Sequence, residues 1–282
     1  MTAPALIDRR LLLVSGKGGV GKSTVAAALA TAAVRRGRKV RLDEVGHVAP
    51  APLPGVAVAA IDGDAALDEY LGRIIPRVFH HFLVRNPLYR RFAAGAPGLA
   101  DLMVLGKLAD DARVGGWDLV IADVGATGHA LQLLGMAAAA DAAFGAGLVR
   151  KEVDRIRREL ADPAYAAVVP VTTPEQLAID EALELDRGAR ALGLAVGPVI
   201  VNRVHDAPCE PDDVPAPAPG AAPLVVEALR RGRSHAVRAA LDRVEIARLE
   251  AVTDDAVRLP ALMVETFGAA ALGALADLLE VA

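Results

Sequence analysis

The fold is decided by the stretch Gly16-Lys17-Gly18-Gly19-Val20-Gly21-Lys22-Ser23-Thr24. It follows an apolar run, Leu11–Val14, that predicts a buried strand, and it precedes an Ala-rich segment, Val25–Arg36, that predicts a helix. Glycines let the backbone N–H groups of such a loop converge without Cβ clashes, and the helix start adds a dipole that favours an anion. Strand, glycine loop and helix therefore predict a phosphate-binding loop rather than a chance glycine turn.

Each polar side chain of this loop has a predicted role toward a bound nucleotide. Lys22 is placed to reach the β- and γ-phosphates, the Ser23 hydroxyl to bind Mg²⁺, and Thr24 to contact the α-phosphate. The loop thus predicts a phosphate-bearing ligand together with Mg²⁺.

Length and composition favour one α/β domain spanning residues 1–282. Hydrophobic residues make up 54% of the chain, yet no run of about 18 residues is both strongly apolar and uncharged. Cys209 is the single cysteine, which fits a reducing compartment, and the first residues lack a signal-peptide pattern. We therefore expect a cytoplasmic protein. The net charge of −4 gives no reason to expect a nucleic-acid partner.

Strand and helix patterns alternate along most of the chain. This alternation predicts a three-layer fold with a mostly parallel sheet and helices on both faces. We expect strands at 10–15, 39–45, 56–61, 117–123, 167–171, 197–201 and 257–259. We expect helices at 22–36, 129–138, 142–160, 174–192, 223–252 and 266–281. Gly37 is predicted to end the first helix, and Thr173 and Thr266 to cap two later ones.

Two regions depart from the alternation. Residues 62–114 predict an inserted helical lobe, which the helices at 129–162 could join. This lobe is rich in aromatic and Arg residues, so it is either a lobe with its own core and a solvated basic face or a docking surface for a partner, an apolar segment or an anionic membrane. Residues 207–223 carry six prolines and predict an extended loop without a fold element.

A second candidate site segment begins at Asp123, the last residue of a predicted strand. An acid at the carboxyl end of a strand beside a phosphate loop is placed to hold Mg²⁺; the alternative is a simple turn aspartate. Thr127 and Gly128 are predicted to form a flexible turn that senses the γ-phosphate. For His129, which opens a helix, packing and chemistry both stay open.

The loop carries an early lysine, Lys17, and in this form it resembles the deviant Walker A group of ATPases, which includes ParA, MinD, nitrogenase iron protein and ArsA. Asp123–Leu134, which reads DVGATGHALQLL, resembles switch II of the arsenical-pump and tail-anchor-targeting ATPases within that group. The resemblance extends from about residue 10 to 280. It also covers Thr173-Pro174-Glu175, Val201-Asn202-Arg203 and Arg258-Leu259-Pro260.

The resemblance implies several roles. Lys17 would reach the partner's nucleotide across a dimer and act catalytically together with Lys22; the alternatives are a phosphate contact within its own chain or a solvated residue. Asn202, and less directly Pro260, would hold adenine. The partner would be a second copy or a paralogous ATPase, with a client protein or membrane partner on the helical lobe.

The departures from this family concern hydrolysis and clients. Gly46 falls where relatives carry the acid that orients the attacking water, and a glycine cannot polarise water. Glu44 is the nearest replacement that we favour, since strand alternation turns Asp43 to the opposite face. The chain also lacks the cysteine sets that relatives use for arsenite or zinc, and its four methionines are few for a client groove.

Three functions follow as expectations. The first is a dimeric Mg·ATP-dependent switch of the ArsA type, and the second is a slow or non-hydrolysing subunit that relies on a paralogous partner. The third is a ParA- or MinD-like positioning ATPase, but the last predicted helix has no Lys or Arg for membrane tethering, and only Arg230, Arg231, Arg233 and Arg238 offer a basic stripe.

Overall fold

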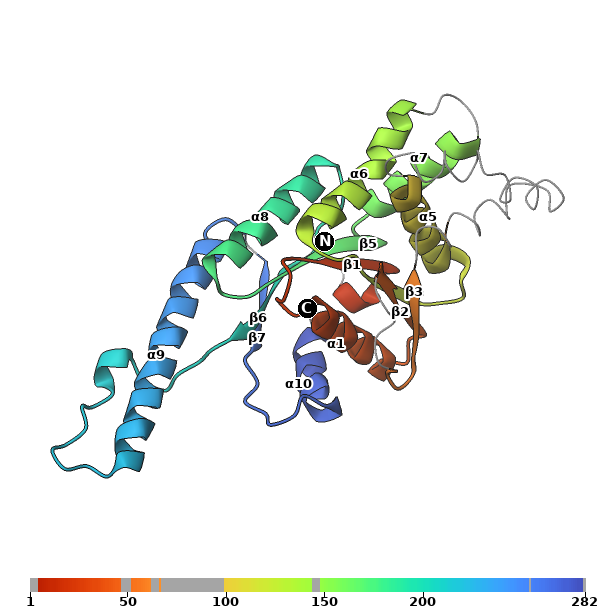
Figure 1. The fold of residues 1–282 in the computed structure, drawn as a ribbon. Helices are drawn as coiled ribbons and strands as arrows, with labels where there is room; N and C mark the ends of the chain where they lie inside the picture. The colour runs from red at the N-terminus through yellow and green to blue at the C-terminus, as the bar shows by residue number, and fades with distance from the viewer. Residues whose placement is uncertain are drawn as a thin grey trace, which may run out of the picture.

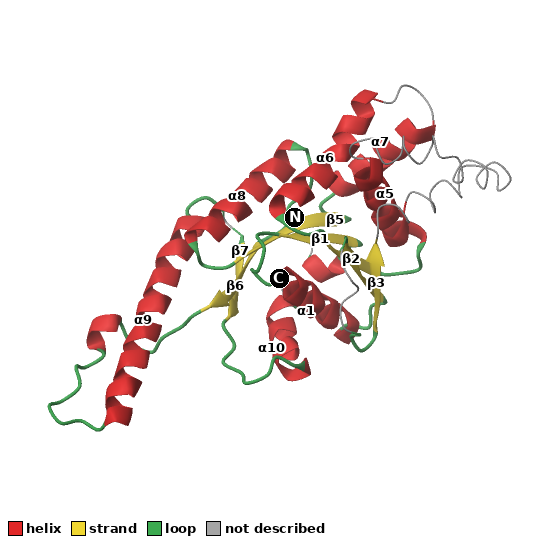
Figure 2. Ribbon diagram, in the orientation of Figure 1, coloured by secondary structure: helices red, strands yellow, loops and turns green. Residues whose placement is uncertain are grey.

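Seven parallel strands form the centre of the computed structural model, which describes residues 5–46, 52–61, 66, 99–143, 148–253 and 255–280. The strand order is β3-β2-β4-β1-β5-β6-β7, and every pairing between neighbours is parallel. Helices cover both faces of this sheet (Figures 1 and 2). The predicted α/β fold with a parallel sheet is therefore confirmed.

The strands are β1 (Leu11–Ser15), β2 (Val40–Val45), β3 (Val56–Ile61), β4 (Leu119–Asp123), β5 (Ala166–Thr172), β6 (Val199–Val204) and β7 (Ala256–Pro260). The helices are α1 (Lys22–Arg35), α5 (Leu99–Val114), α6 (Thr127–Ala143), α7 (Leu148–Ala161), α8 (Gln176–Ala191), α9 (Pro223–Glu250) and α10 (Ala269–Leu279). Two short 3₁₀ helices, Leu6–Asp8 and Pro211–Asp213, complete the described elements.

The core lies in two layers, one on each side of the sheet. Along β1, Leu11 and Leu13 pack into the layer of α5 to α8, whereas Leu12 and Val14 pack into the layer of α1 and α10. This alternation follows from the two-residue period of a strand. It explains why the strand reads as a continuous apolar run, since both of its faces are buried.

The first helix ends as predicted. Gly37 has φ +78°, and its N–H bonds the carbonyl of Val34, while the N–H of Arg38 bonds the carbonyl of Ala33. These two hydrogen bonds define a Schellman motif, in which a glycine adopts the left-handed conformation without Cβ strain.

Other helix boundaries differ from the prediction. The helices expected at 129–138 and 142–160 are α6, which begins at Thr127, and α7, which begins at Leu148. The two predicted threonine caps are wrong, because Glu175 precedes α8, Gly268 precedes α10, and neither N-cap residue makes a side-chain cap hydrogen bond. In the segment before α8, the Thr173 carbonyl instead accepts a hydrogen bond from the N–H of Glu175.

Most of the predicted helical lobe lies outside the described residues. Of residues 62–114, α5 and Ala66 are described, and α5 packs on β1 and β4 as well as on α6 and α7. α5 therefore belongs to the layer that covers the sheet. None of the described helices is long and apolar enough to span a membrane.

The proline-rich loop is more ordered than predicted. It contains the 3₁₀ helix Pro211–Asp213, and ion pairs from Arg233 to Asp212 and from Arg243 to Glu210 tie it to α9. The first half of α9 extends away from the sheet beside this loop, as Figure 1 shows.

Candidate nucleotide-binding site

The phosphate-loop segment leaves β1 at the middle of the sheet, between β4 and β5, and ends in the first turn of α1. Two of its glycines have no room for a side chain. A Cβ at Gly16 (φ +154°) would lie 2.0 Å from the carbonyl oxygen of Val171, and one at Gly21 (φ +95°) would lie 2.3 Å from Nδ2 of Asn202. Gly18, by contrast, faces open space. The loop shape therefore depends on glycine where β5 and β6 press against it.

Ser23 and Asp123 come together as predicted for a magnesium site. The Ser23 hydroxyl donates to Oδ2 of Asp123 at 2.6 Å, and the Asp123 side chain is buried. Hydroxyl and carboxylate oxygens are the hard ligands that Mg²⁺ accepts, and Mg²⁺ usually takes its remaining ligands from phosphates and water. These two residues would hold the ion, which would neutralise phosphate charge.

The two lysines of the loop point to different partners. Lys22 Nζ donates to the carbonyl of Lys17 at 3.2 Å, so its ammonium group lies over the loop. Lys17 Nζ lies 3.5 Å from Oε1 of Glu181 on α8, with both side chains about one-third exposed. An ion pair this exposed contributes little and exchanges partners readily.

A pocket of about 800 Å³ adjoins the loop. Its walls include the predicted site residues Lys17, Gly18, Gly19, Val20, Thr24, Asn202 and Pro260. Ligand pockets of nucleotides and drug-sized molecules fall in this range of volume. Sequence reasoning missed His205, Arg238 and Phe267, which also line it; no local motif marks them, because separate segments of the chain bring them together.

The Asn202 side chain is held by the protein on both sides. Nδ2 donates to the carbonyl of Val20 at 2.9 Å, and Oδ1 accepts from the N–H of Arg203 at 3.0 Å. A primary amide keeps one further donor hydrogen and one further lone pair after these bonds. The predicted contact to adenine stays a prediction, and Asn202 also links β6 to the phosphate loop.

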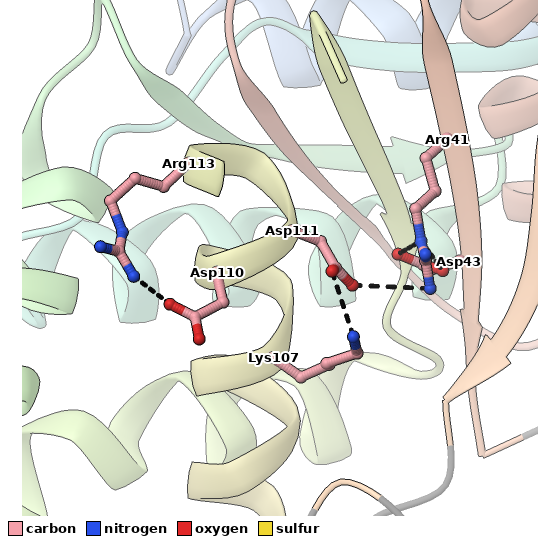
Figure 3. A network of polar contacts seen from close by, with 6 residues as sticks. All are labelled: Arg41, Asp43, Lys107, Asp110, Asp111 and Arg113. Atoms are coloured by element: carbon pink, nitrogen blue, oxygen red, sulfur yellow. Dashed lines mark hydrogen bonds and ion pairs between the residues drawn. The ribbon is translucent and has the colours of Figure 1, made fainter. Parts of the chain in front are cut away.

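The end of β2 separates the two candidate acids as strand alternation predicts. The Asp43 side chain lies on the side of the sheet that α5 covers. Arg41, two residues earlier on β2, donates from Nε to both carboxylate oxygens of Asp43 at 2.8 and 3.0 Å. Arg41 also forms an ion pair with Asp111 on α5 (Figure 3). Burial raises the pKa of Asp43 to about 6, although the Arg41 charge opposes the shift. Glu44 is buried and stands opposite Asp123 in the β2–β4 register. Gly46, with φ +74°, follows directly after β2.

The segment after Asp123 differs from the predicted flexible turn. Thr127 and Gly128 form the first turn of α6, while the turn itself lies at Gly125, which has φ +81°. The N–H of Gly125 bonds Asp123, and its carbonyl accepts from the Ser15 hydroxyl. The Thr127 hydroxyl is buried and makes no hydrogen bond to the described residues.

A phosphate loop on the central strand of a parallel sheet, with a buried acid on the next strand bonded to the loop serine, defines a P-loop nucleotide-binding protein. The comparison with protein families agrees with this class. The profile described as "CobQ/CobB/MinD/ParA nucleotide binding domain" matches residues 11–208, and the chain belongs to that family.

Individual relatives are similar over most of this chain. A protein named ATPase BagA from Mycobacterium tuberculosis (strain ATCC 25618 / H37Rv) is 32% identical over 243 residues, which cover 75% of this chain and 70% of that protein. The arsenical pump-driving ATPase of Escherichia coli is 26% identical over 206 residues, 69% of this chain and 35% of that protein. A putative arsenical pump-driving ATPase of Halobacterium salinarum is 25% identical over 200 residues, 60% of this chain and 31% of that protein.

Proposed function

We propose that this chain is an ATPase switch that binds Mg·ATP in the pocket beside the phosphate loop and dimerises through the face that carries Lys17. The proposal rests on one observation above all: Lys17 lines the pocket beside the phosphate loop, and its side chain makes an exposed ion pair with Glu181. A lysine in that position can leave Glu181 at small cost and reach a phosphate presented by a second molecule. The names of the relatives, which are ATPases, support ATP as the nucleotide.

The chemistry divides among the loop residues. Backbone N–H groups and Lys22 would bind the β- and γ-phosphates, and Ser23 with Asp123 would hold the magnesium ion, which neutralises phosphate charge when bound. Lys17 from the partner would neutralise charge on the γ-phosphate as it leaves. Asp123 also accepts a hydrogen bond from the N–H of Gly125, so this carboxylate links the loop serine to the segment that leads into α6.

Nucleotide-dependent association tests this proposal. We would measure sedimentation velocity of the wild type with saturating Mg·ATP, Mg·ADP or neither, and compare Lys17→Ala, Lys22→Ala and the surface control Lys151→Ala. We expect wild type and Lys151→Ala to dimerise in Mg·ATP. Lys17→Ala should bind ATP yet remain monomeric, and Lys22→Ala should lose most ATP affinity.

Two results would count against the proposal separately. If the wild type stays monomeric in Mg·ATP, the proposed dimer of identical chains is wrong. If Lys22→Ala binds ATP as well as the wild type does, the proposed nucleotide binding at this loop is wrong.

A slow subunit of a heterodimer is the second candidate, and the end of β2 favours it. Asp43 accepts a hydrogen bond from Arg41 on the face of the sheet opposite α1, and Gly46 has no side chain that could orient water. Glu44 is the remaining candidate among the described residues to orient water. Steady-state ATP turnover decides: a rate that falls about a hundredfold in Glu44→Gln supports hydrolysis by this chain, whereas a negligible wild-type rate, restored by a paralogous ATPase, supports the subunit role.

The client or transported species is a separate question. We propose to trap it with Asp123→Asn, which should bind ATP without turning it over, by purifying the variant from its native host and identifying the proteins that accompany it.

A further inference from the structure

A second polar cluster adjoins the pocket. It consists of His205, which follows β6, and His235, Arg238 and Asp242 on α9; of these, His205 and Arg238 line the pocket. Asp242 is 1% exposed, an unusual degree of burial for a carboxylate. Its Oδ2 accepts hydrogen bonds from the backbone N–H of His205 and contacts Nδ1 of the same residue, both at 2.8 Å.

The second oxygen of this carboxylate faces an arginine of the pocket wall. Asp242 Oδ1 makes no hydrogen bond to the described residues and lies 3.8 Å from Nε of Arg238. Arg238 in turn lies 3.3 Å from Glu175, which lines the same pocket. His235 meets the His205 ring edge to face, with 5.9 Å between the ring centres. The buried carboxylate thus fixes the ring of His205 from one side.

His205 lines the part of the pocket that the nucleoside would reach if the phosphates of a bound nucleotide lay on the loop. The phosphate loop follows β1, and β6 is two strands away in the sheet, a distance of roughly 10 Å at the usual strand spacing. A nucleotide whose phosphates lie on the loop and whose body fills the pocket would bring its base toward the carboxyl end of β6. Pro260, Ala261 and Leu262 supply apolar walls there.

The contact with Asp242 also decides which ring nitrogen carries hydrogen. A carboxylate oxygen accepts hydrogen bonds, so this contact keeps a hydrogen on Nδ1, and in the neutral form of the ring the lone pair is then on Nε2. An acceptor at Nε2 matches the exocyclic amino group of adenine. It opposes the carbonyl oxygen that guanine and hypoxanthine carry at the same place.

We propose that His205 is a specificity-determining residue that selects adenine over guanine, and that Asp242 is a positioning residue that sets its tautomer. The inference rests on the proposed nucleotide binding in this pocket. It goes beyond that function by assigning base choice to a residue pair on β6 and α9.

Binding measurements with ATP, GTP and ITP test the assignment. Affinities are measured by equilibrium dialysis in Mg²⁺ for wild type, His205→Ala, His205→Lys and Asp242→Asn, with Arg243→Ala as a control on the outer side of α9. We expect the wild type and the control to prefer ATP. In His205→Ala the ratio of ATP affinity to GTP affinity should fall about tenfold. The substitution removes the acceptor for the adenine amino group and the repulsive contact with the guanine carbonyl oxygen.

The other two variants separate specificity from structure. His205→Lys offers only donors, so it should shift preference toward GTP and ITP. Asp242→Asn can donate to Nδ1 and move the hydrogen to Nε2, which should produce a shift of the same sign. Variants that bind ATP with the wild-type ATP-to-GTP ratio, or that lose all three nucleotides equally, overturn the inference. If the wild type binds no nucleotide, the proposed function is wrong. The experiment therefore distinguishes failure of the proposed function from failure of the inference about His205.

Discussion

At the scale of single residues, close contacts between strands explain the glycines of the phosphate loop. Gly16 meets the carbonyl of Val171 and Gly21 meets the amide of Asn202, so each glycine is required by a segment more than 150 residues away. The loop motif can be recognised in the sequence from the spacing of its residues. The residues that exclude a side chain at these glycines cannot be predicted from the sequence, because they depend on which strands lie beside β1.

Gly21→Ala should therefore destabilise the nucleotide-free protein. The substitution adds a Cβ 2.3 Å from Nδ2 of Asn202 at a backbone with φ +95°, and we expect a loss of about 2 kcal/mol and a Tm lower by roughly 5 °C. Gly18→Ala is the matched control, because its Cβ meets open space. Differential scanning calorimetry checks both, and equal Tm values for the two variants would contradict the argument.

Asp43 predicts a particular dependence of stability on pH. Its pKa rises from 3.8 when unfolded to about 6 when folded, so the folded chain binds the proton more tightly between these values. Stability from this group is therefore greatest at low pH and falls as pH rises from about 4 to 6, by about 3 kcal/mol in total.

The comparison with Asp43→Asn isolates this contribution. Urea unfolding of wild type and variant between pH 4 and 7.5 should give a free-energy difference that changes across the window, since only the wild type titrates there. A difference that stays constant with pH would show that the carboxyl titrates alike in both states.

At the scale of elements, α1 and α10 form the layer beneath the phosphate loop. Leu279 is fully buried in this layer, whereas Asp277 pairs with Arg35 on the exposed side of the same helix. Leu279→Ala should cost about 2–5 kcal/mol through lost burial and a cavity. Asp277→Ala should cost less than about 1 kcal/mol, because an exposed ion pair is screened by water.

Equilibrium unfolding in urea measures both changes under identical conditions. An Asp277→Ala variant that loses as much stability as Leu279→Ala would mean that the ion pair, rather than apolar packing, holds α10 on α1.

Sequence patterns located every described strand because each is short, apolar and bounded by turn residues. They also placed the starts of α1 and α9 correctly, but they failed at the starts of α6, α7, α8 and α10. Thr173 and Thr266 have the composition of caps, but α8 begins after Glu175 and α10 after Gly268. Similarly, Thr127 and Gly128 have the composition of a turn, yet they belong to α6, since Gly125 makes the bend. Local preference is weak wherever tertiary packing decides which residue starts a helix.

At the scale of the whole molecule, the charge distribution argues against binding to nucleic acid. The net charge is −4, and each arginine of the basic stripe on α9 pairs with a carboxylate: Arg230 and Arg231 share Glu227, Arg233 pairs with Asp212, and Arg238 pairs with Glu175. Hydrogen bonds from Arg230 and Arg231 lower the pKa of Glu227 to about 2, so its carboxylate stays charged even at a pH where a glutamate is usually protonated.

We therefore expect only weak binding to duplex DNA, with a Kd above about 10⁻⁴ M at physiological salt. Fluorescence anisotropy with a labelled duplex at 50 and 200 mM salt, with and without Mg·ATP, measures it. Tight binding that falls steeply with salt and is lost in Arg231→Ala would instead support a ParA-like role.

The strand order has a consequence for how the chain is made. Leu11 of β1 pairs with Val120 of β4 and with Ala166 of β5, so the central strand precedes the other described strands in the chain and acquires its neighbours more than 100 residues later. At about 5–20 residues per second, a ribosome needs roughly 5–20 s to deliver β4. During that time the apolar strand that carries the phosphate loop has no sheet to join. The strand that leads into the phosphate loop is thus exposed without its sheet partners until β4 has been synthesised.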